Sequence, residues 1–217
     1  MAAARTAPAR GAFARNLLAA LALLASVGAA QAAGGPLGID HRLSYDDSGV
    51  WSRGKQLALV DALIAGEIGL GLWQGGDSRL GRTDWHAIDA SILSGAAAQV
   101  LKYAFRRSRP YESNNPDDWF RHGAHYSFPS GEVTAVAAIV TPFILEYSED
   151  RPAVWALAVL PVYDAVARMK AQAHWQTDVL AGAALGVWSG SYAMRRDRSF
   201  TLSVLPGWVG AGWKRDF

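Results

Sequence analysis

Apolar residues gather in five long segments that polar or glycine-rich stretches separate. Their length and spacing favour helices rather than strands. The helices are expected over residues 56–73, 83–105, 130–147, 152–171 and 178–196. Thr83 is placed to cap the second of these helices, and Arg109 ends its segment because a residue before proline avoids helical geometry. The pattern predicts a mainly α fold, a helical bundle.

The C-terminal tail has a different pattern. Residues 199–205 alternate apolar and polar side chains, which is typical of a strand. Pro206 and Gly207 then predict a turn, and residues 209–217 could return as the second half of a hairpin. A single hairpin cannot close an outer-membrane barrel, so the terminal Phe217 carries no weight for that class.

The N-terminal segment looks like a secretory leader. Arg5, Arg10 and Arg15 precede an apolar run, and residues 30–32 form a small-x-small cleavage site. We therefore expect a signal peptide over residues 1–32, export to the periplasm, and one domain over residues 33–217. A retained membrane anchor is the alternative, although the run is short for a span of about 20 residues. Removing the leader changes the formal net charge from +2 to −1, because it takes three arginines and no acid.

Composition excludes several classes of function. The basic character belongs to the leader, so it gives no support to nucleic-acid binding. The chain has no cysteine, which excludes thiol nucleophiles, Cys-ligated zinc and disulfides. The longest uncharged stretch after the leader, residues 179–194, is short for a membrane span. This favours buried helices in a bundle that is soluble without detergent. Nine tryptophans leave peripheral contact with a bilayer open.

Three short stretches carry candidate chemistry. Lys102 and Arg109 are seven residues apart, about two helical turns, so both can face one side. Ser130 and Gly131 open an apolar run, and free N–H groups at such a helix start bind phosphate oxygens. The third stretch carries Arg168, His174 and Asp178. Taken singly, each has an ordinary structural interpretation, and Arg106 and Arg107 are expected on a solvated face.

Taken together, the three stretches describe one phosphate site. Lys102, Arg109 and Arg168 supply three cations, which match a phosphate dianion. His174 offers a neutral nitrogen nucleophile. Asp178, four residues further on, can hold its other ring nitrogen in the right tautomer.

The motifs K-x6-RP, PSG and R-x5-H-x3-D resemble those of the type 2 phosphatidic acid phosphatase superfamily, which includes bacterial class A acid phosphatases and vanadium haloperoxidases. The match runs in order from residue 102 to residue 178. The resemblance implies that the phosphate is held by five residues, namely Lys102, Arg109, Ser130, Gly131 and Arg168. It implies that His174 attacks phosphorus to form a phosphohistidine, that Asp178 orients His174, and that no metal or other cofactor is needed.

The second motif departs from the family. Glu132 stands where the family has a histidine that protonates the leaving group, and Ala167 stands where serine is usual. One hypothesis makes Glu132 the replacement general acid, which predicts an acidic optimum, with His122 and His125 as rival donors. The other makes Glu132 a complement to the helix dipole, worth about 0.3–1 kcal/mol.

The leading interpretation is an exported, metal-independent phosphatase. Its substrate would be a phosphate monoester or diphosphate, on a small molecule or on a lipid or polyprenyl carrier. The alternatives are a phosphate-binding protein without turnover and a vanadate-dependent oxidase. The long polar loop at residues 111–127 is expected to select the substrate.

Overall fold

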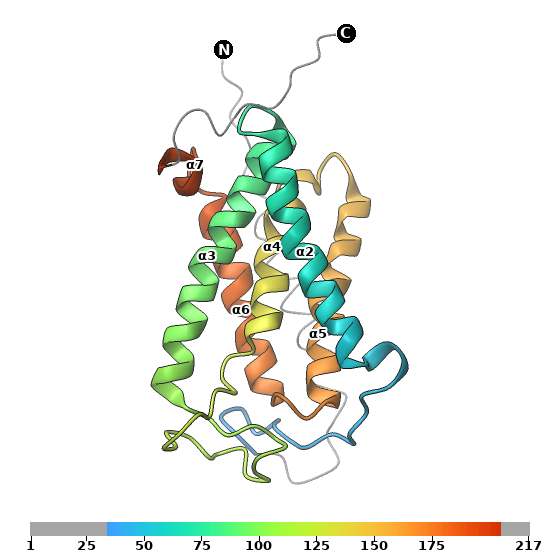
Figure 1. Cartoon of the computed structure of the whole chain (residues 1–217), viewed down its shortest axis with the longest axis vertical. Helices are drawn as coiled ribbons and strands as arrows, with labels where there is room; N and C mark the ends of the chain where they lie inside the picture. The colour runs from blue at the N-terminus through green and yellow to red at the C-terminus, as the bar shows by residue number, and fades with distance from the viewer. Residues whose placement is uncertain (1–33, 205–217) are drawn as a thin grey trace.

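The computed structural model describes residues 34–204, and it confirms a mainly α fold (Figure 1). Five long or medium helices form the bundle: α2 (Arg53–Gln74), α3 (Arg79–Phe105), α4 (Gly131–Tyr147), α5 (Val159–Lys170) and α6 (Gln176–Ala193). Three short elements complete it: η1 (Gly49–Trp51), η2 (Pro152–Ala158) and α7 (Phe200–Val204). Within the described residues the only β pairing is one bridge between Gly34 and Asp40.

The helices begin and end close to the positions that the sequence predicts, with two differences. The predicted helix over residues 152–171 is divided into the 3-10 helix η2 and the α-helix α5. The helix α3 begins at Arg79, one turn before Thr83. Ser78 caps it, because its Oγ accepts a hydrogen bond from the N–H of Gly81 at 2.9 Å. The same helix ends at Phe105, where Arg106 takes a left-handed backbone conformation with φ of 40°. This turn redirects the chain just before Arg109.

Close contact between α4 and α6 positions the site. The helix α4 lies at the centre of the bundle (Figure 1), with most of its side chains buried. Along α6, Gly182 and Gly190 face it without side chains. A Cβ on Gly182 would lie 2.6 Å from the carbonyl oxygen of Ser130, and one on Gly190 would lie 2.7 Å from the Cβ of Thr141. These glycines let the first turns of α4 and α6 lie side by side.

The C-terminal tail does not form the predicted strand. Residues 200–204 form the short helix α7 instead of the first strand of a hairpin. The buried carboxylate of Asp89 on α3 explains the difference: it accepts hydrogen bonds from the N–H groups of Phe200 and Thr201 at 2.8 and 3.1 Å. A carboxylate that binds consecutive N–H groups stabilises a helix start, which outweighs the alternating pattern. The predicted return strand, like the predicted leader, lies outside the described residues.

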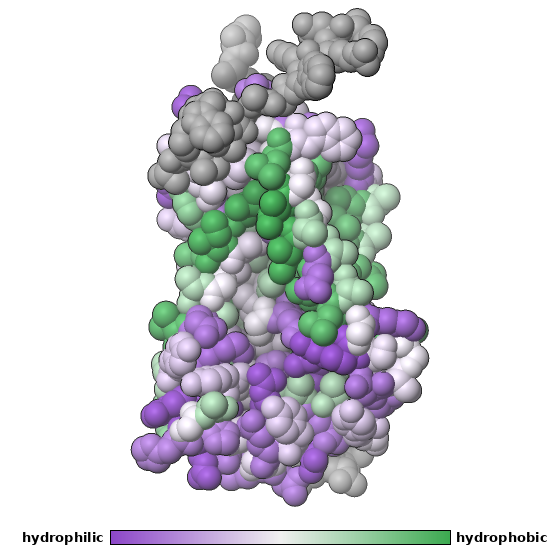
Figure 2. Space-filling model, in the orientation of Figure 1, coloured by the Kyte–Doolittle hydropathy of each residue, from purple (hydrophilic) through white to green (hydrophobic). Residues whose placement is uncertain are grey.

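On the face that Figure 2 shows, most apolar residues gather in the upper half and polar residues dominate the lower half. The apolar half includes α2, whose side chains Ile64, Ile68, Leu72 and Trp73 are exposed. By length and composition, α2 and the segment Pro152–Lys170 could each cross a membrane, and α2 is mostly exposed in the bundle. The expectation that all apolar helices are buried, as in a soluble bundle, is therefore wrong for α2. The polar half holds the loops and the predicted site.

Candidate active site

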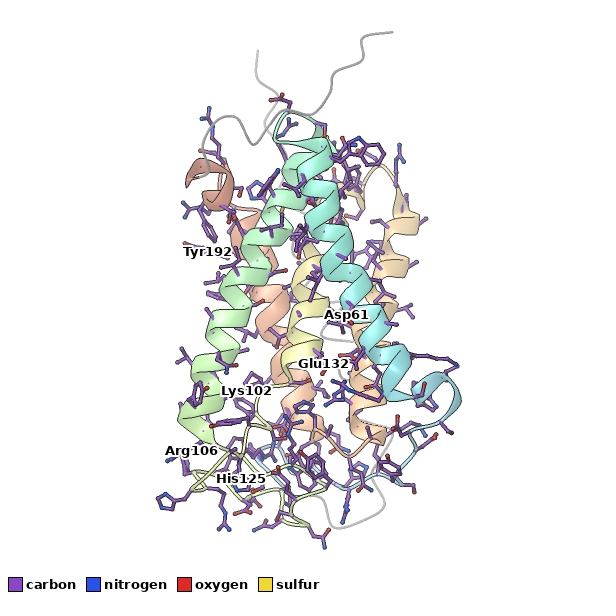
Figure 3. The ribbon with its side chains drawn as sticks, in the orientation of Figure 1. Asp61, Lys102, Arg106, His125, Glu132 and Tyr192 are labelled. Atoms are coloured by element: carbon purple, nitrogen blue, oxygen red, sulfur yellow. The ribbon has the colours of Figure 1, made fainter. Side chains whose placement is uncertain are left out.

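The three motif stretches meet at the loop end of the bundle. Lys102 comes from the last turn of α3, Ser130 and Gly131 from the start of α4, and Arg168 from the last turn of α5. His174 lies in the turn between α5 and α6. Figure 3 shows Lys102 and Glu132 lying between the helices, just above the loops that carry His125.

Lys102 and Arg109 converge as predicted, but by a different route. The Nζ of Lys102 donates to the carbonyl oxygens of Tyr126 and Pro129 at 2.9 and 2.6 Å. Arg109 donates to the same Tyr126 oxygen at 3.3 Å and to that of Ala173 at 3.1 Å. Since α3 ends at Phe105, Arg109 is on the loop, and the predicted spacing of two helical turns does not explain the convergence.

Burial gives Lys102 an unusual ionisation. Burial and, secondly, the positive charge of Arg109 lower the pKa of Lys102 to about 8. Lys102 therefore carries its full charge only below that pH. A bound phosphate would favour the charged form, because an opposite charge stabilises the ammonium group.

Two buried donors lack partners at the start of α4. Within residues 34–204, the buried side-chain oxygen of Ser130 has no hydrogen-bond partner. The buried Nε of Arg168 has none in that range either. Lys102 passes close by, since a Cβ on Gly131 would lie 3.5 Å from its Cε. Buried polar atoms are nearly always hydrogen-bonded, so unpaired donors beside a cation and a helix start indicate an anion site.

His174 is held as a neutral base. It is 4% exposed, and burial lowers the pKa of its imidazole to about 3. Its Nδ1 lies 3.8 Å from the Oδ2 of Asp178, which is close enough for charge interaction but longer than a hydrogen bond. That oxygen accepts hydrogen bonds from Ser127 Oγ at 2.5 Å and from the N–H of Trp175 at 2.9 Å. Asp178 is thus fixed in place beside the imidazole.

The expectation that Arg107 lies on a solvated face is wrong. Its side chain is fully buried, and it donates to Asp178 Oδ1 and to Asp40 Oδ2 at 2.6 Å each. Its guanidinium also stacks on Trp119, with 4.2 Å from Cζ to the ring centroid. Asp40, in turn, accepts from the N–H and Oγ1 of Thr177 at 2.8 and 2.7 Å. The segment before η1 therefore supports the site through Asp40.

Glu132 is bound by an arginine that the sequence did not single out. Both of its oxygens accept hydrogen bonds from Arg53 at the start of α2, at 2.5 and 2.8 Å. Burial opposes ionisation, but these bonds and the charge of Arg168 outweigh it and hold the pKa of Glu132 below its ordinary value. With Arg53 in place, Glu132 is an ionised acceptor. A general-acid role would require Glu132 to lose Arg53 first.

The rival proton donors lie in the loop. His122 is exposed. The Nδ1 of His125 lies 3.1 Å from Glu112 Oε2, which also accepts from the N–H of Arg109. Among residues 34–204, no group of three or more His, Asp or Glu side chains is placed to hold a metal ion.

Three cations of the site differ in how closely carboxylates approach them. Arg107 pairs with both Asp178 and Asp40, and Arg53 pairs with Glu132. Among the described residues, Lys102 and Arg109 have no ion pair, and Arg168 shares Glu132 with Arg53. Of these, Arg168 is 3.8 Å from Glu132, and only 8% of its side chain is exposed.

Two curated proteins are similar in sequence to part of this chain. A lipid A 1-phosphatase of Rhizobium johnstonii is 35% identical over 102 residues, which is 45% of this chain and 41% of the relative. One of Porphyromonas gingivalis is 33% identical over 98 residues, 44% of this chain and 19% of the relative. The matched region is thus less than half the length of these curated relatives.

A solved structure and a family model complete the comparison. The crystal structure of Aquifex aeolicus LpxE has a TM-score of 0.52 and 19% identity, and covers 82% of this chain and 94% of that chain. This likeness shows the fold. The model of the PAP2 superfamily matches residues 85–200, more than half of the chain and all three motif stretches. The chain therefore belongs to the PAP2 superfamily.

Proposed function

We propose that this chain is a phosphatase that cleaves a phosphate monoester or diphosphate through a phosphohistidine at His174. One observation carries the proposal: two unpaired buried donors, Ser130 Oγ and Arg168 Nε, share a site with a neutral histidine. The donors suit phosphate oxygens, and a neutral imidazole suits nucleophilic attack on phosphorus.

The proposed reaction has two steps. The Nε2 of His174 attacks phosphorus, a P–N bond forms, and the P–O bond to the leaving group breaks. Water then attacks the same phosphorus and releases inorganic phosphate from His174. The three cations and the N–H groups at the start of α4 stabilise the charge on the phosphoryl oxygens in both transition states. Asp178 stabilises the positive imidazole that forms during the reaction.

The surface and the relatives favour a phosphorylated lipid as substrate. The matched proteins of Rhizobium johnstonii and Porphyromonas gingivalis are named lipid A 1-phosphatases. The exposed apolar side of α2 belongs to the same bundle that carries the site (Figure 2). An exposed apolar patch of this kind is typical of a surface that contacts lipid. We propose a membrane-associated protein that, with residues 1–32 as its signal peptide, acts in the periplasm.

Vanadate is expected to inhibit phosphate release, and EDTA is expected to leave it unchanged. Vanadate can adopt five coordination on His174 and so resemble the transition state. The cations and the histidine supply the charge stabilisation and the nucleophile without a metal. The measurement is phosphate release from monoester and diphosphate substrates. Binding of vanadate without phosphate release from any substrate would favour the non-catalytic alternative, and loss of activity in EDTA that a divalent ion restores would contradict the proposal.

The pH profile should have an alkaline limb that Lys102 sets. Because the pKa of Lys102 is lowered to about 8, its charge is present below pH 8 and lost above it. We expect kcat/KM to fall above pH 8. Lys102→Arg should move this limb upward by more than one pH unit, since arginine stays charged to about pH 12. Lys170→Arg is the matched control, because Lys170 pairs with Asp46. An unmoved limb in Lys102→Arg would exclude Lys102 as its origin.

A further inference from the structure

Arg53 and Glu132 belong to a closed set of contacts beside the phosphate site. Arg53 binds Glu132, and Glu132 lies 3.8 Å from Arg168. Arg168 donates to the Oε1 of Gln56 at 3.3 Å, and the same oxygen lies 3.4 Å from Arg53. The set links the first turn of α2 to the phosphate-binding ends of α4 and α5.

Within this set, Arg53 is the member that faces solvent. Its side chain is 38% exposed, compared with 23% for Glu132 and 8% for Arg168, and Gln56 is fully buried. A guanidinium has five N–H donors in one plane, and Arg53 uses two on Glu132 and one on Gln56. Among the described residues, two N–H donors of the Arg53 guanidinium thus remain unused beside Glu132 and Gln56.

Glu132 fixes the position of the Arg53 guanidinium. A two-bond contact between arginine and carboxylate fixes the plane of the guanidinium as well as its position. Glu132 is itself the second residue of α4, directly after Gly131. An acid at this place would repel phosphate if it were unpaired, and the pairing with Arg53 removes that repulsion.

The ionisation of Glu132 limits which leaving groups suit the site. An ionised Glu132 bound to Arg53 has no proton to give. Where Glu132 gives no proton, the leaving group that departs most easily is a weak base that carries its own negative charge. The phosphate monoester released from a diphosphate meets this condition, and an alkoxide does not. The unused N–H donors of Arg53, held in one plane by Glu132, would stabilise the charge that develops on such a group.

We propose that Arg53 is a substrate-binding residue for the second phosphoryl group of a diphosphate, and that Glu132 is the positioning residue that holds Arg53. The proposal rests on the phosphatase function above. His174 attacks the terminal phosphorus, and the bond from that phosphorus to the bridging oxygen breaks. The bridging oxygen keeps the electron pair and leaves as part of a monophosphate, which Arg53 binds. Water then releases inorganic phosphate from His174.

The test uses the full protein with farnesyl diphosphate and farnesyl monophosphate, which share one alcohol. The informative variant is the double change Arg53→Gln with Glu132→Gln, because it removes the ion pair as a unit and leaves no unpaired carboxylate. We expect kcat/KM for the diphosphate to fall about 10–100-fold, and the loss for the monophosphate to be at least about tenfold smaller. The KM for the diphosphate should rise, and Arg53→Lys alone should restore part of the difference.

Arg79→Gln is the matched control. Arg79 also binds two carboxylates, those of Glu146 and Asp150, but it joins the start of α3 to the end of α4, at the opposite end of these helices from the site. It should leave the ratio of the two substrates unchanged. Equal losses for both substrates in the double variant would overturn the proposal. So would a Glu132→Gln variant that slows the monophosphate more than the diphosphate, because that is the result expected of a general acid.

A binding measurement separates this inference from the phosphatase function. Methylene diphosphonate, a diphosphate that cannot be cleaved, is titrated by calorimetry beside inorganic phosphate. The double variant should bind the diphosphonate about 10–100-fold more weakly and inorganic phosphate with a much smaller loss. Failure of the wild-type protein to release phosphate would contradict the phosphatase function but not the role of Arg53 in binding. Unchanged diphosphonate binding in the double variant would sink the role of Arg53, whatever the activity.

Discussion

Replacing His174 by glutamine should reduce kcat by about 10⁴–10⁶-fold, the range seen when a hydrolase loses its nucleophile. Glutamine keeps a polar group of similar size but cannot form the P–N bond. The loss should appear in kcat for every substrate, because the covalent step is common to all of them. Phosphate release gives the rate, and quenching with ³²P-labelled substrate in an alkaline denaturant, which preserves the P–N bond, should trap labelled protein in the wild type and none in the variant.

His86→Gln is the matched control for that experiment. His86 is a second buried histidine, 8% exposed, on α3. It has no place in the proposed reaction, so its variant should keep the labelled intermediate and most of the activity. Binding of inorganic phosphate to His174→Gln reports on whether the cation site is intact. A folded His174→Gln protein that turns over at the wild-type rate would contradict the mechanism.

The site shows which parts of a fold short motifs can predict. The motif residues have specific chemistry, and their order and spacing alone predict that Lys102, Arg109, Arg168 and His174 share one site. The structure brings them together, although Arg109 arrives on a loop. The residue types support this prediction, because few functions bring several cations and one histidine together in one site.

Residues that act through distant partners are not predictable in the same way. Arg107 is expected to face solvent, but the left-handed turn at Arg106 carries the next residue inside. The contact between Asp40 and Thr177 spans 137 positions of sequence, and that between Arg53 and Glu132 spans 79. No local pattern contains such a pairing. A contact of this kind depends on two distant segments, and the sequence of neither segment indicates it alone.

The C-terminal tail and α2 also depend on neighbouring elements that their own sequences do not reveal. Alternation over residues 199–205 favours a strand, yet Asp89 of α3 determines a helix there. The apolar composition of α2 predicts burial, yet the bundle leaves much of it exposed. Hydrophobic periodicity indicates that a segment has an apolar face, but the neighbouring elements decide what that face contacts.

The largest expected effect on stability is that of Arg107→Met. The change removes the partner of two buried carboxylates, those of Asp40 and Asp178. Breaking a buried ion pair on one side usually costs about 3–5 kcal/mol, because it leaves uncompensated charge inside the protein. We expect a loss of this size in the free energy of unfolding, measured by denaturant titration. Arg106→Met is the matched control and should change it by no more than about 0.5 kcal/mol.

The pH dependence of this loss distinguishes charge from packing. Burial would raise the pKa of Asp178, but His174 and Arg107 outweigh it and hold that pKa below its ordinary value. The stabilisation from Asp178 is therefore present above its unfolded pKa of about 3.9 and is lost as the pH falls through the lower folded value. In Arg107→Met the unpaired carboxylates take up protons at higher pH, which relieves the penalty. The two unfolding free energies should therefore converge as the solution is acidified toward about pH 4. A difference that stays constant from about pH 8 to about pH 4 would mean that Arg107 stabilises the fold through packing on Trp119 rather than through its charge.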